Sequence, residues 1–136
     1  MIKMGEANDD EMAKLMEETA EIQTILENSG FYMIDAKIQE IANGLGLGEI
    51  GLDRDVTDLS GGQRTKVLLT KLLLENPTIL ILDEPTNYLD EEHITWLTRY
   101  LQEYENSFIL VSHDVPFINN TCNVIYHIEK CRAYKI

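Results

Sequence analysis

Polar side chains follow two apolar runs of this sequence, and the two carboxylates after the first run could act on a phosphate. Asp83 and Glu84 follow the apolar run at residues 79–82, and Ser112 and His113 follow a second run at residues 108–111. Short continuous apolar runs are typical of parallel strands buried on both faces, and ligands of open α/β sheets bind beyond the carboxyl ends of such strands. One carboxylate there can hold Mg²⁺, and the other can orient or deprotonate a water molecule. The pattern therefore predicts phosphate chemistry at one edge of a sheet.

A second candidate site lies at the start of a predicted helix upstream of these runs. Residues 60–63 read Ser60-Gly61-Gly62-Gln63, and this spacing predicts a capping box in which Ser60 and Gln63 each bond the other's backbone amide. Two glycines let a backbone approach a phosphate closely, and a helix start offers free amides and the positive end of the helix dipole. Both interpretations can hold, because an anion site at a helix start needs an ordered start.

The order of these motifs resembles that of the ATP-binding cassette (ABC) ATPases. Their signature loop, Walker B strand, D-loop and switch histidine correspond here to Leu59-Ser60-Gly61-Gly62-Gln63, Leu82-Asp83-Glu84-Pro85, Leu89-Asp90 and Ser112-His113-Asp114. One family element has no counterpart, since the sequence contains no Gly-x-x-x-x-Gly-Lys-Ser/Thr phosphate loop. The resemblance therefore covers the later part of a cassette, and we expect this chain to be a piece of a longer protein.

The resemblance implies roles for the motif residues, with ATP as substrate and Mg²⁺ as its metal. Asp83 would hold the Mg²⁺, Glu84 would be the catalytic carboxylate, and His113 would contact the γ-phosphate. Residues 60–63 would bind the nucleotide of a second cassette, and Asp90 would touch the opposite site across the dimer. Because the phosphate loop supplies the Lys and the amides that bind the β- and γ-phosphates, the isolated chain is expected not to hydrolyse ATP.

The turn at residues 83–90, Asp-Glu-Pro-Thr-Asn-Tyr-Leu-Asp, is similar to that of the ABC-F branch of the family. Members of this branch are soluble tandem ATPases that act on the ribosome, and they often carry His where Tyr88 stands. The resemblance implies a cytoplasmic, ribosome-associated translation or antibiotic-resistance factor. Three alternatives stay open: an ATPase subunit of a membrane ABC transporter, half of a Rad50/SMC-like DNA-repair ATPase, and a regulatory half-domain without activity.

Composition limits the possible partners. The chain has 24 acidic and 11 basic residues, for a net charge of −13. Direct binding to bare nucleic acid or to an anionic membrane needs a basic face, so neither is expected of this segment. No apolar run reaches the roughly 18 residues of a membrane span. Cys122 and Cys131 are expected to be free thiols of a cytosolic protein.

The apolar periodicity predicts an α/β chain. Helices are expected at residues 9–28, capped by Asn8 or Asp9, and at residues 35–43, 61–75, 91–104 and 115–121. Strands are expected at residues 78–82 and 108–111, with a hairpin that pairs residues 124–128 with 132–136. The glycine-rich segment 44–58 is expected to be a flexible connection. Asp90 is expected to cap the helix at 91–104.

These elements predict a partial P-loop NTPase-like core of the ABC cassette type, with parallel strands and an α-helical subdomain. Residues 1–58 would form the helical subdomain, with a possible arm helix at 9–28. Residues 59–136 would form the signature helix and the C-terminal half of the ATPase core. In a complete cassette core, the strand at 79–82 would have neighbouring strands on both edges. Because this chain lacks the strands of the N-terminal half, we expect it to self-associate.

Overall fold

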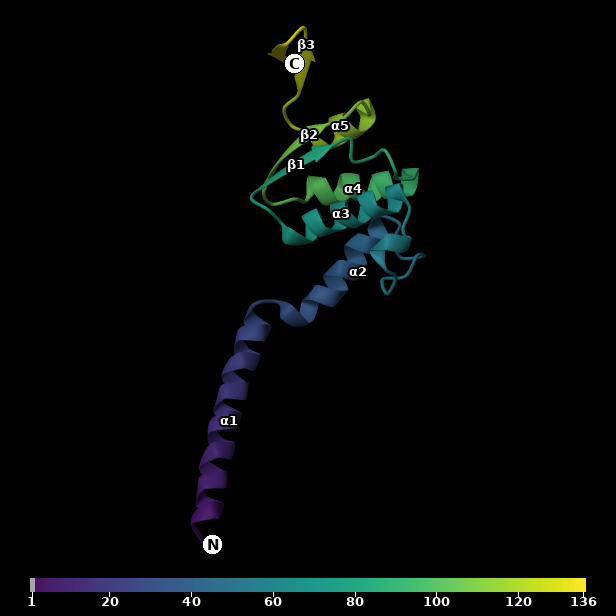
Figure 1. The fold of residues 1–136 in the computed structure, drawn as a ribbon. Helices are drawn as coiled ribbons and strands as arrows, with labels where there is room; N and C mark the ends of the chain where they lie inside the picture. The colour runs from purple at the N-terminus through teal and green to yellow at the C-terminus, as the bar shows by residue number, and fades with distance from the viewer. Residues whose placement is uncertain (1) are drawn as a thin grey trace. The chain divides into compact units, whose positions relative to one another are not determined.

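The computed structural model describes residues 2–136, with side chains described from residue 8 onward. It divides the chain into two compact units, Met1–Lys37 and Ile38–Ile136. Figure 1 shows the helices and strands of both units. The boundary between the compact units falls at residues 37/38, while the functional division predicted at 58/59 stays a prediction.

The first unit is built on helix α1, Ile2–Asn28, which a short 3₁₀ turn, η1, follows at Phe31–Met33. The helix begins upstream of residue 9, so Asn8 and Asp9 lie inside it and the predicted cap is wrong. The physical reason is that most of residues 2–7 favour helix, which extends the first turn. Gly30 ends this segment in the left-handed region, at φ +75°.

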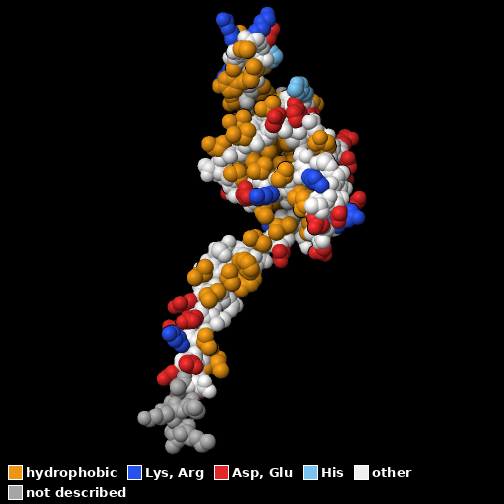
Figure 2. All heavy atoms as spheres, viewed as in Figure 1, with side chains coloured by type: hydrophobic (Ala, Val, Ile, Leu, Met, Phe, Trp, Pro, Cys, Tyr) orange, Lys and Arg blue, Asp and Glu red, His pale blue; other side chains and the backbone are white. Residues whose placement is uncertain are grey.

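The surface of α1 carries exposed apolar side chains among many acidic ones (Figure 2). The exposed apolar residues recur at helical spacing and are Met12, Leu15, Met16, Ile22 and Ile25. Within the described residues, no helix combines the length and the apolar character needed to cross a bilayer. The next helix, α2, runs over Ile34–Gly44, close to the predicted bounds.

The second unit contains a two-stranded parallel sheet in which β1, Ile79–Asp83, pairs with β2, Ser107–Val111. Its other elements are η2 (Val56–Asp58), α3 (Gly61–Glu75), α4 (Glu91–Gln102), α5 (Val115–Thr121), β3 (Tyr126–Glu129) and β4 (Arg132–Lys135). The predicted elements are therefore confirmed, apart from shifts of one to two residues at several ends. The antiparallel β3–β4 hairpin turns at Lys130 and Cys131, both at positive φ. Cys122 and Cys131 are free thiols.

One face of the β1–β2 sheet is covered by the core of this unit. Figure 1 shows α3 and α4 side by side next to the sheet. The core side chains come from α2, its following turn, α3, β1, α4 and α5, and are Ile41, Leu45, Leu69, Leu73, Leu80, Leu82, Leu97, Leu101 and Phe117. Phe108 and Leu110 of β2 are partly buried and pack against this cluster. Burial of these apolar side chains is the main source of stability.

The opposite face of this sheet is exposed. Ile79 and Ile81 are 61% and 65% exposed, whereas Leu80 and Leu82 are almost completely buried. The prediction that both faces of this strand are buried is therefore wrong for the part of the chain that the structure describes. The physical reason is that helices cover only the face to which residues 80 and 82 point, since successive side chains of a strand alternate between faces.

Aromatic side chains in α4 and just after it contact the end of α3 and the residues before β1. Trp96 stacks on Tyr100 with ring centroids 5.1 Å apart. The Tyr100 hydroxyl donates to the Leu73 carbonyl at 3.2 Å, and the Tyr104 hydroxyl donates to the Pro77 carbonyl at 2.6 Å. These contacts join α4 to the end of α3 and to the residues before β1, as expected for core aromatics with a polar end.

We expect Gly44→Ala to destabilise the protein. A Cβ at residue 44 would lie 2.1 Å from Trp96 Cε2, so the indole or the end of α2 must move. Overpacking of this kind costs about 1–3 kcal/mol of unfolding free energy. Gly61→Ala is the matched control, because a Cβ at residue 61 would meet no atom within 4 Å. Urea unfolding measures both variants, and equal midpoints would contradict this packing.

We expect the 136-residue chain to self-associate through the exposed sheet face. The face carries Ile79, Ile81, Ile109 and Val111, all at least half exposed. Contiguous apolar surface and open strand edges favour association. Ile81→Lys with Ile109→Lys should lower the mass measured by light scattering. Ile25→Lys on α1 is the control, and a monomeric wild-type chain at high concentration would contradict the prediction.

Candidate functional site

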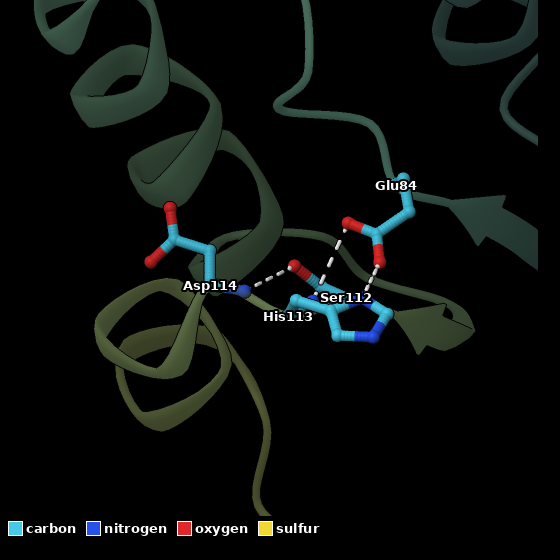
Figure 3. A network of polar contacts seen from close by, with 4 residues as sticks. All are labelled: Glu84, Ser112, His113 and Asp114. Atoms are coloured by element: carbon cyan, nitrogen blue, oxygen red, sulfur yellow. Dashed lines mark hydrogen bonds and ion pairs between the residues drawn. The ribbon is translucent and has the colours of Figure 1, made fainter.

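Glu84 and His113 meet beyond the carboxyl ends of the two parallel strands (Figure 3). The strand register places Asp83 opposite Val111, and the Glu84 amide donates to the Val111 carbonyl at 2.8 Å. The His113 amide then donates to Glu84 Oε2 at 3.3 Å, and the imidazole Nδ1 contacts Glu84 Oε1. The structure thus brings together the two residues that the sequence predicts as catalytic.

The backbone at Glu84 lies in the left-handed region, at φ +46°. This conformation is uncommon for a residue with a side chain, and it costs on the order of 1–3 kcal/mol where it occurs. It turns the chain sharply out of β1 and directs the carboxylate toward the end of β2 (Figure 3). Glu84 is therefore held in place by its own backbone bond and by two contacts with His113.

The two side chains shift each other's protonation. The hydrogen bond with His113 holds the pKa of the Glu84 carboxyl below its usual value, against the opposing effect of desolvation. The hydrogen bond with Glu84, with its charge and that of Asp83, raises the pKa of His113 above 6.5. A carboxylate only accepts hydrogen bonds, so the imidazole carries its proton on Nδ1. At neutral pH Glu84 is ionised and can accept a proton.

Ser112 and Asp114 support this pair from either side of His113. The Asp114 amide donates to the Ser112 hydroxyl at 3.0 Å, and the Phe117 amide donates to Asp114 Oδ1 at 3.1 Å. Asp114 is thus the cap of α5, and buried Phe117 anchors that helix in the core. A hydrogen bond with Ser112 also lowers the pKa of Glu84. The supporting role of Ser112 could not be read from the motif alone.

Asp83 lies exposed at the end of β1, next to Glu84. Among the described side chains, no three His, Cys, Asp or Glu residues converge in a geometry that could hold a metal ion. Mg²⁺ often takes one or two carboxylates and fills its other positions with water and substrate phosphates. A single carboxylate at this place fits that kind of site, in which the nucleotide brings most of the ligands.

The signature turn, which is the loop at residues 59–63, forms the predicted capping box. The Gln63 amide donates to Ser60 Oγ at 3.2 Å, and the Ser60 amide donates to Gln63 Oε1 at 2.9 Å. Arg64 also donates to the Val56 and Thr57 carbonyls, at 3.2 and 2.9 Å, and so ties α3 to the preceding turn η2. No pattern in the sequence pointed to this role of Arg64.

Gly62 brings the signature turn against the segment between β1 and α4. A Cβ at residue 62 would lie 2.9 Å from Cδ1 of Tyr88, so the ring covers this glycine. A Cβ at Gly61 would instead point into open space. The sequence offered no signal for the contact at Gly62, because Tyr88 lies far along the chain, beyond α3 and β1.

Asp90 occupies the N-terminal position of α4, but its side chain makes no capping hydrogen bond. The expectation that it caps the helix is therefore wrong as regards the side chain. Its Oδ2 lies 4.0 Å from Nε2 of His93, whose Nδ1 bonds the Gly44 carbonyl at 3.0 Å. A Cβ at Gly46 would lie 2.6 Å from the same ring. The start of segment 44–58 is thus packed on α4 instead of forming a loose connection.

The paired pKa shifts predict the pH response of His113. Its raised pKa stabilises the fold below pH 6.5 and loses that effect as pH rises through the folded-state value. The lowered pKa of Glu84 acts above pH 4.5 and loses its effect as pH falls through the folded-state value. Between pH 4.5 and pH 6.5, both pKa shifts therefore stabilise the folded protein.

We expect NMR titration of His113 to give a midpoint above 6.5, and Glu84→Gln to lower it, since the amide removes the negative charge and the strongest hydrogen bond. Glu129→Gln, an exposed acid in the β3–β4 hairpin, is the control and should leave the midpoint unchanged. An unchanged midpoint in Glu84→Gln would contradict the pairing.

Comparison with known proteins agrees with this geometry. The family model described as "ABC transporter" matches residues 5–87. The chain is 71% identical over 127 residues to the uncharacterized ABC transporter ATP-binding protein YfmM of Bacillus subtilis, covering 93% of this chain and 24% of that protein. It is 39% identical over 121 residues to the energy-dependent translational throttle protein EttA of Mycobacterium tuberculosis, covering 89% of this chain and 21% of EttA. The chain thus spans less than a quarter of either relative.

Two solved structures share the fold. The ATP-binding subunit of an ABC transporter superposes with a TM-score of 0.66 at 21% identity, over 76% of this chain and 45% of that one. The other structure is a complex of archaeal ribosomal stalk protein aP1 and archaeal ribosome recycling factor aABCE1. Its matching chain has a TM-score of 0.57 at 30% identity, covering 82% of this chain and 22% of that one. The α/β cassette fold is therefore confirmed. The chain belongs to the ABC transporter family and corresponds to part of an ATP-binding cassette of the ABC-F type.

Proposed function

We propose that this chain supplies the signature turn, the Walker B carboxylates and the switch histidine of a cassette that hydrolyses ATP. The observation that carries the proposal is the contact between Glu84, at the end of β1, and His113, at the end of β2. An ionised carboxylate held at the open edge of a parallel sheet is well placed to orient a water molecule and accept its proton.

Each site residue has a distinct part in this proposal. Glu84 is the general base, and His113 contacts the γ-phosphate through Nε2, because its Nδ1 proton is engaged by Glu84. Asp83 supplies one oxygen ligand to the Mg²⁺ that accompanies ATP. When bound, that ion neutralises the developing negative charge on the phosphates.

The signature turn and Asp90 act across an interface with a second cassette. The amides at the start of α3 and the Ser60 hydroxyl would bind the partner's nucleotide, with the helix dipole favouring its negative charge. Asp90 is mostly exposed and makes no capping bond, so its carboxylate is available to reach the opposite site. In this proposal, residues 1–58 belong to the helical subdomain and residues 59–136 to the second half of the ATPase core.

We propose further that the longer protein works in the cytoplasm on the ribosome. Support comes from two similar proteins, one named a translational throttle and one described as a ribosome recycling factor bound to a ribosomal stalk protein. The net charge of −13 disfavours direct contact between this segment and RNA. The ribosome would therefore be reached mainly through other parts of the protein.

We expect Glu84→Gln to trap ATP in a longer protein that has a complete cassette. The amide keeps the shape of the carboxylate but cannot accept a proton, and loss of a general base lowers turnover by roughly 100-fold or more. Phosphate release measures turnover, and filter binding measures retained ATP. Glu91→Gln, an exposed acid in the first turn of α4, is the matched control. Unchanged turnover in Glu84→Gln would remove Glu84 from the catalytic role.

The Glu84→Gln variant also tests whether the ribosome is the partner of the longer protein. Under the proposal, Glu84→Gln with ATP sediments with ribosomes, whereas a membrane transporter subunit would sediment with the membrane fraction. The 136-residue chain should release no phosphate above background, since it lacks the phosphate-loop Lys. Turnover by this chain that Glu84→Gln abolishes would contradict the two-cassette mechanism.

A further inference from the structure

The two glycines of the signature turn have different surroundings. At Gly61 an added Cβ would meet no atom within 4 Å. At Gly62 it would meet three ring carbons of Tyr88, namely Cδ1 at 2.9 Å, Cγ at 3.4 Å and Cε1 at 3.5 Å. A Cβ at residue 62 would therefore force the Tyr88 ring or the turn at Gly62 to shift, while residue 61 is open.

Backbone conformation does not explain the glycine at residue 62. The described glycines at positive φ are Gly30, Gly46 and Gly51, and Gly62 lies in the first turn of α3. Glycine is a poor helix former compared with alanine, so its presence there needs another physical reason. Close approach of the Tyr88 ring supplies that reason.

Tyr88 is held by the residues around it. The segment between β1 and α4 makes two backbone turns, in which Asn87 bonds the Glu84 carbonyl at 3.3 Å and Leu89 bonds the Thr86 carbonyl at 3.1 Å. Thr86 is buried, and Leu89 packs against the core. The ring is thus carried on an anchored turn, with one side against Gly62 and 56% of the residue still exposed.

We propose that Tyr88 is a positioning residue that sets the place of the signature turn relative to the segment from Glu84 to Asp90. The Ser60–Gln63 capping box orders the turn internally. The bonds from Arg64 to the Val56 and Thr57 carbonyls tie it to η2. The Tyr88 ring adds the contact with the segment that carries the catalytic carboxylate and the D-loop aspartate. Its consequence for ATP hydrolysis rests on the function proposed above, but the contact itself does not.

This arrangement links two parts of the cassette that serve opposite nucleotides. In the proposed function Glu84 acts on the nucleotide of its own cassette, whereas the signature turn binds the nucleotide of the partner. A movement of the β1–α4 segment would shift Tyr88, and with it the amides at the start of α3. Because the contact is made by ring carbons, phenylalanine should keep it and alanine should lose it.

A double-mutant cycle on the 136-residue chain tests the contact without nucleotide. We expect Gly62→Ala to lower the unfolding midpoint and to shift the Tyr88 ring resonances. In the Tyr88→Ala background the loss of midpoint should shrink at least about twofold, since effects of residues in contact are not additive. Gly61→Ala is the matched control and should have the same effect in both backgrounds. An equal cost of Gly62→Ala in both backgrounds would overturn the contact.

Amide hydrogen exchange then tests positioning. We expect Tyr88→Ala to speed exchange and shift the amide signals of residues 61–63, and Tyr88→Phe to restore the wild-type values. Tyr126→Ala, at an exposed tyrosine of the β3–β4 hairpin, controls for loss of an aromatic residue. Unchanged signals at residues 61–63 in Tyr88→Ala would overturn the proposal, whatever the activity of the longer protein.

The activity measurement uses the longer protein with two complete cassettes. We expect Tyr88→Ala to lower kcat by roughly tenfold while KM changes less than about threefold, because a misplaced signature turn weakens transition-state contacts more than ground-state binding. Tyr88→Phe should keep kcat. Displaced amides with an unchanged kcat would overturn the catalytic consequence. An inactive wild-type protein would instead count against the proposed function, leaving the exchange result to decide on the contact.

Discussion

Glu84 can reach His113 because β1 and β2 run parallel and in register, with Asp83 opposite Val111. Parallel strands end at the same edge of a sheet, so residues that follow both strands are neighbours although 29 positions separate them. A shift of one residue in this pairing would turn every side chain of one strand to the other face. It would also break the bond between the Glu84 amide and the Val111 carbonyl, which starts the sharp turn at Glu84.

The pairing register of β1 and β2 is stabilised by packing on one face of the sheet. Leu80 and Leu82 are the side chains of β1 that enter the core. The hydroxyls of Tyr100 in α4 and of Tyr104 just after it donate to the carbonyls of Leu73 in α3 and of Pro77 before β1. Hydrophobic burial fixes which face of the strand points inward, and the two tyrosine hydroxyls add hydrogen bonds that tie the end of α4 to the chain before β1. The opposite face, with Ile79 and Ile81, remains as apolar surface for association.

The segment from Glu84 to Asp90 gathers the functional groups within one short turn. Its first residue is in the left-handed region, its middle is anchored by buried Thr86, and its last lies near His93. The Tyr88 ring lies against Gly62, so this turn is in contact with the signature turn at the start of α3. Strain and close packing of this kind are common where a site must be preorganised.

The sequence by itself determined the family, the order of helices and strands, and the residue types at the site. Those features rest on local patterns: apolar periodicity, the Ser60–Gln63 capping box, and two acids after an apolar run. Sequence patterns placed Glu84 and His113 at the ends of two successive strands, and the resemblance to the family implied their catalytic roles. They failed at the start of α1, where helix propensity continues past the expected cap, and at Asp90, whose side chain turns to His93 instead of capping.

Only the tertiary structure decided which face of β1 is covered, that the Tyr88 ring packs against Gly62, and that Trp96 and His93 pack against Gly44 and Gly46 at the end of α2. These features depend on distances between residues that lie far apart in the chain, on separate helices and strands. Local propensity carries no information on such distances, because the packing of whole helices and strands sets them.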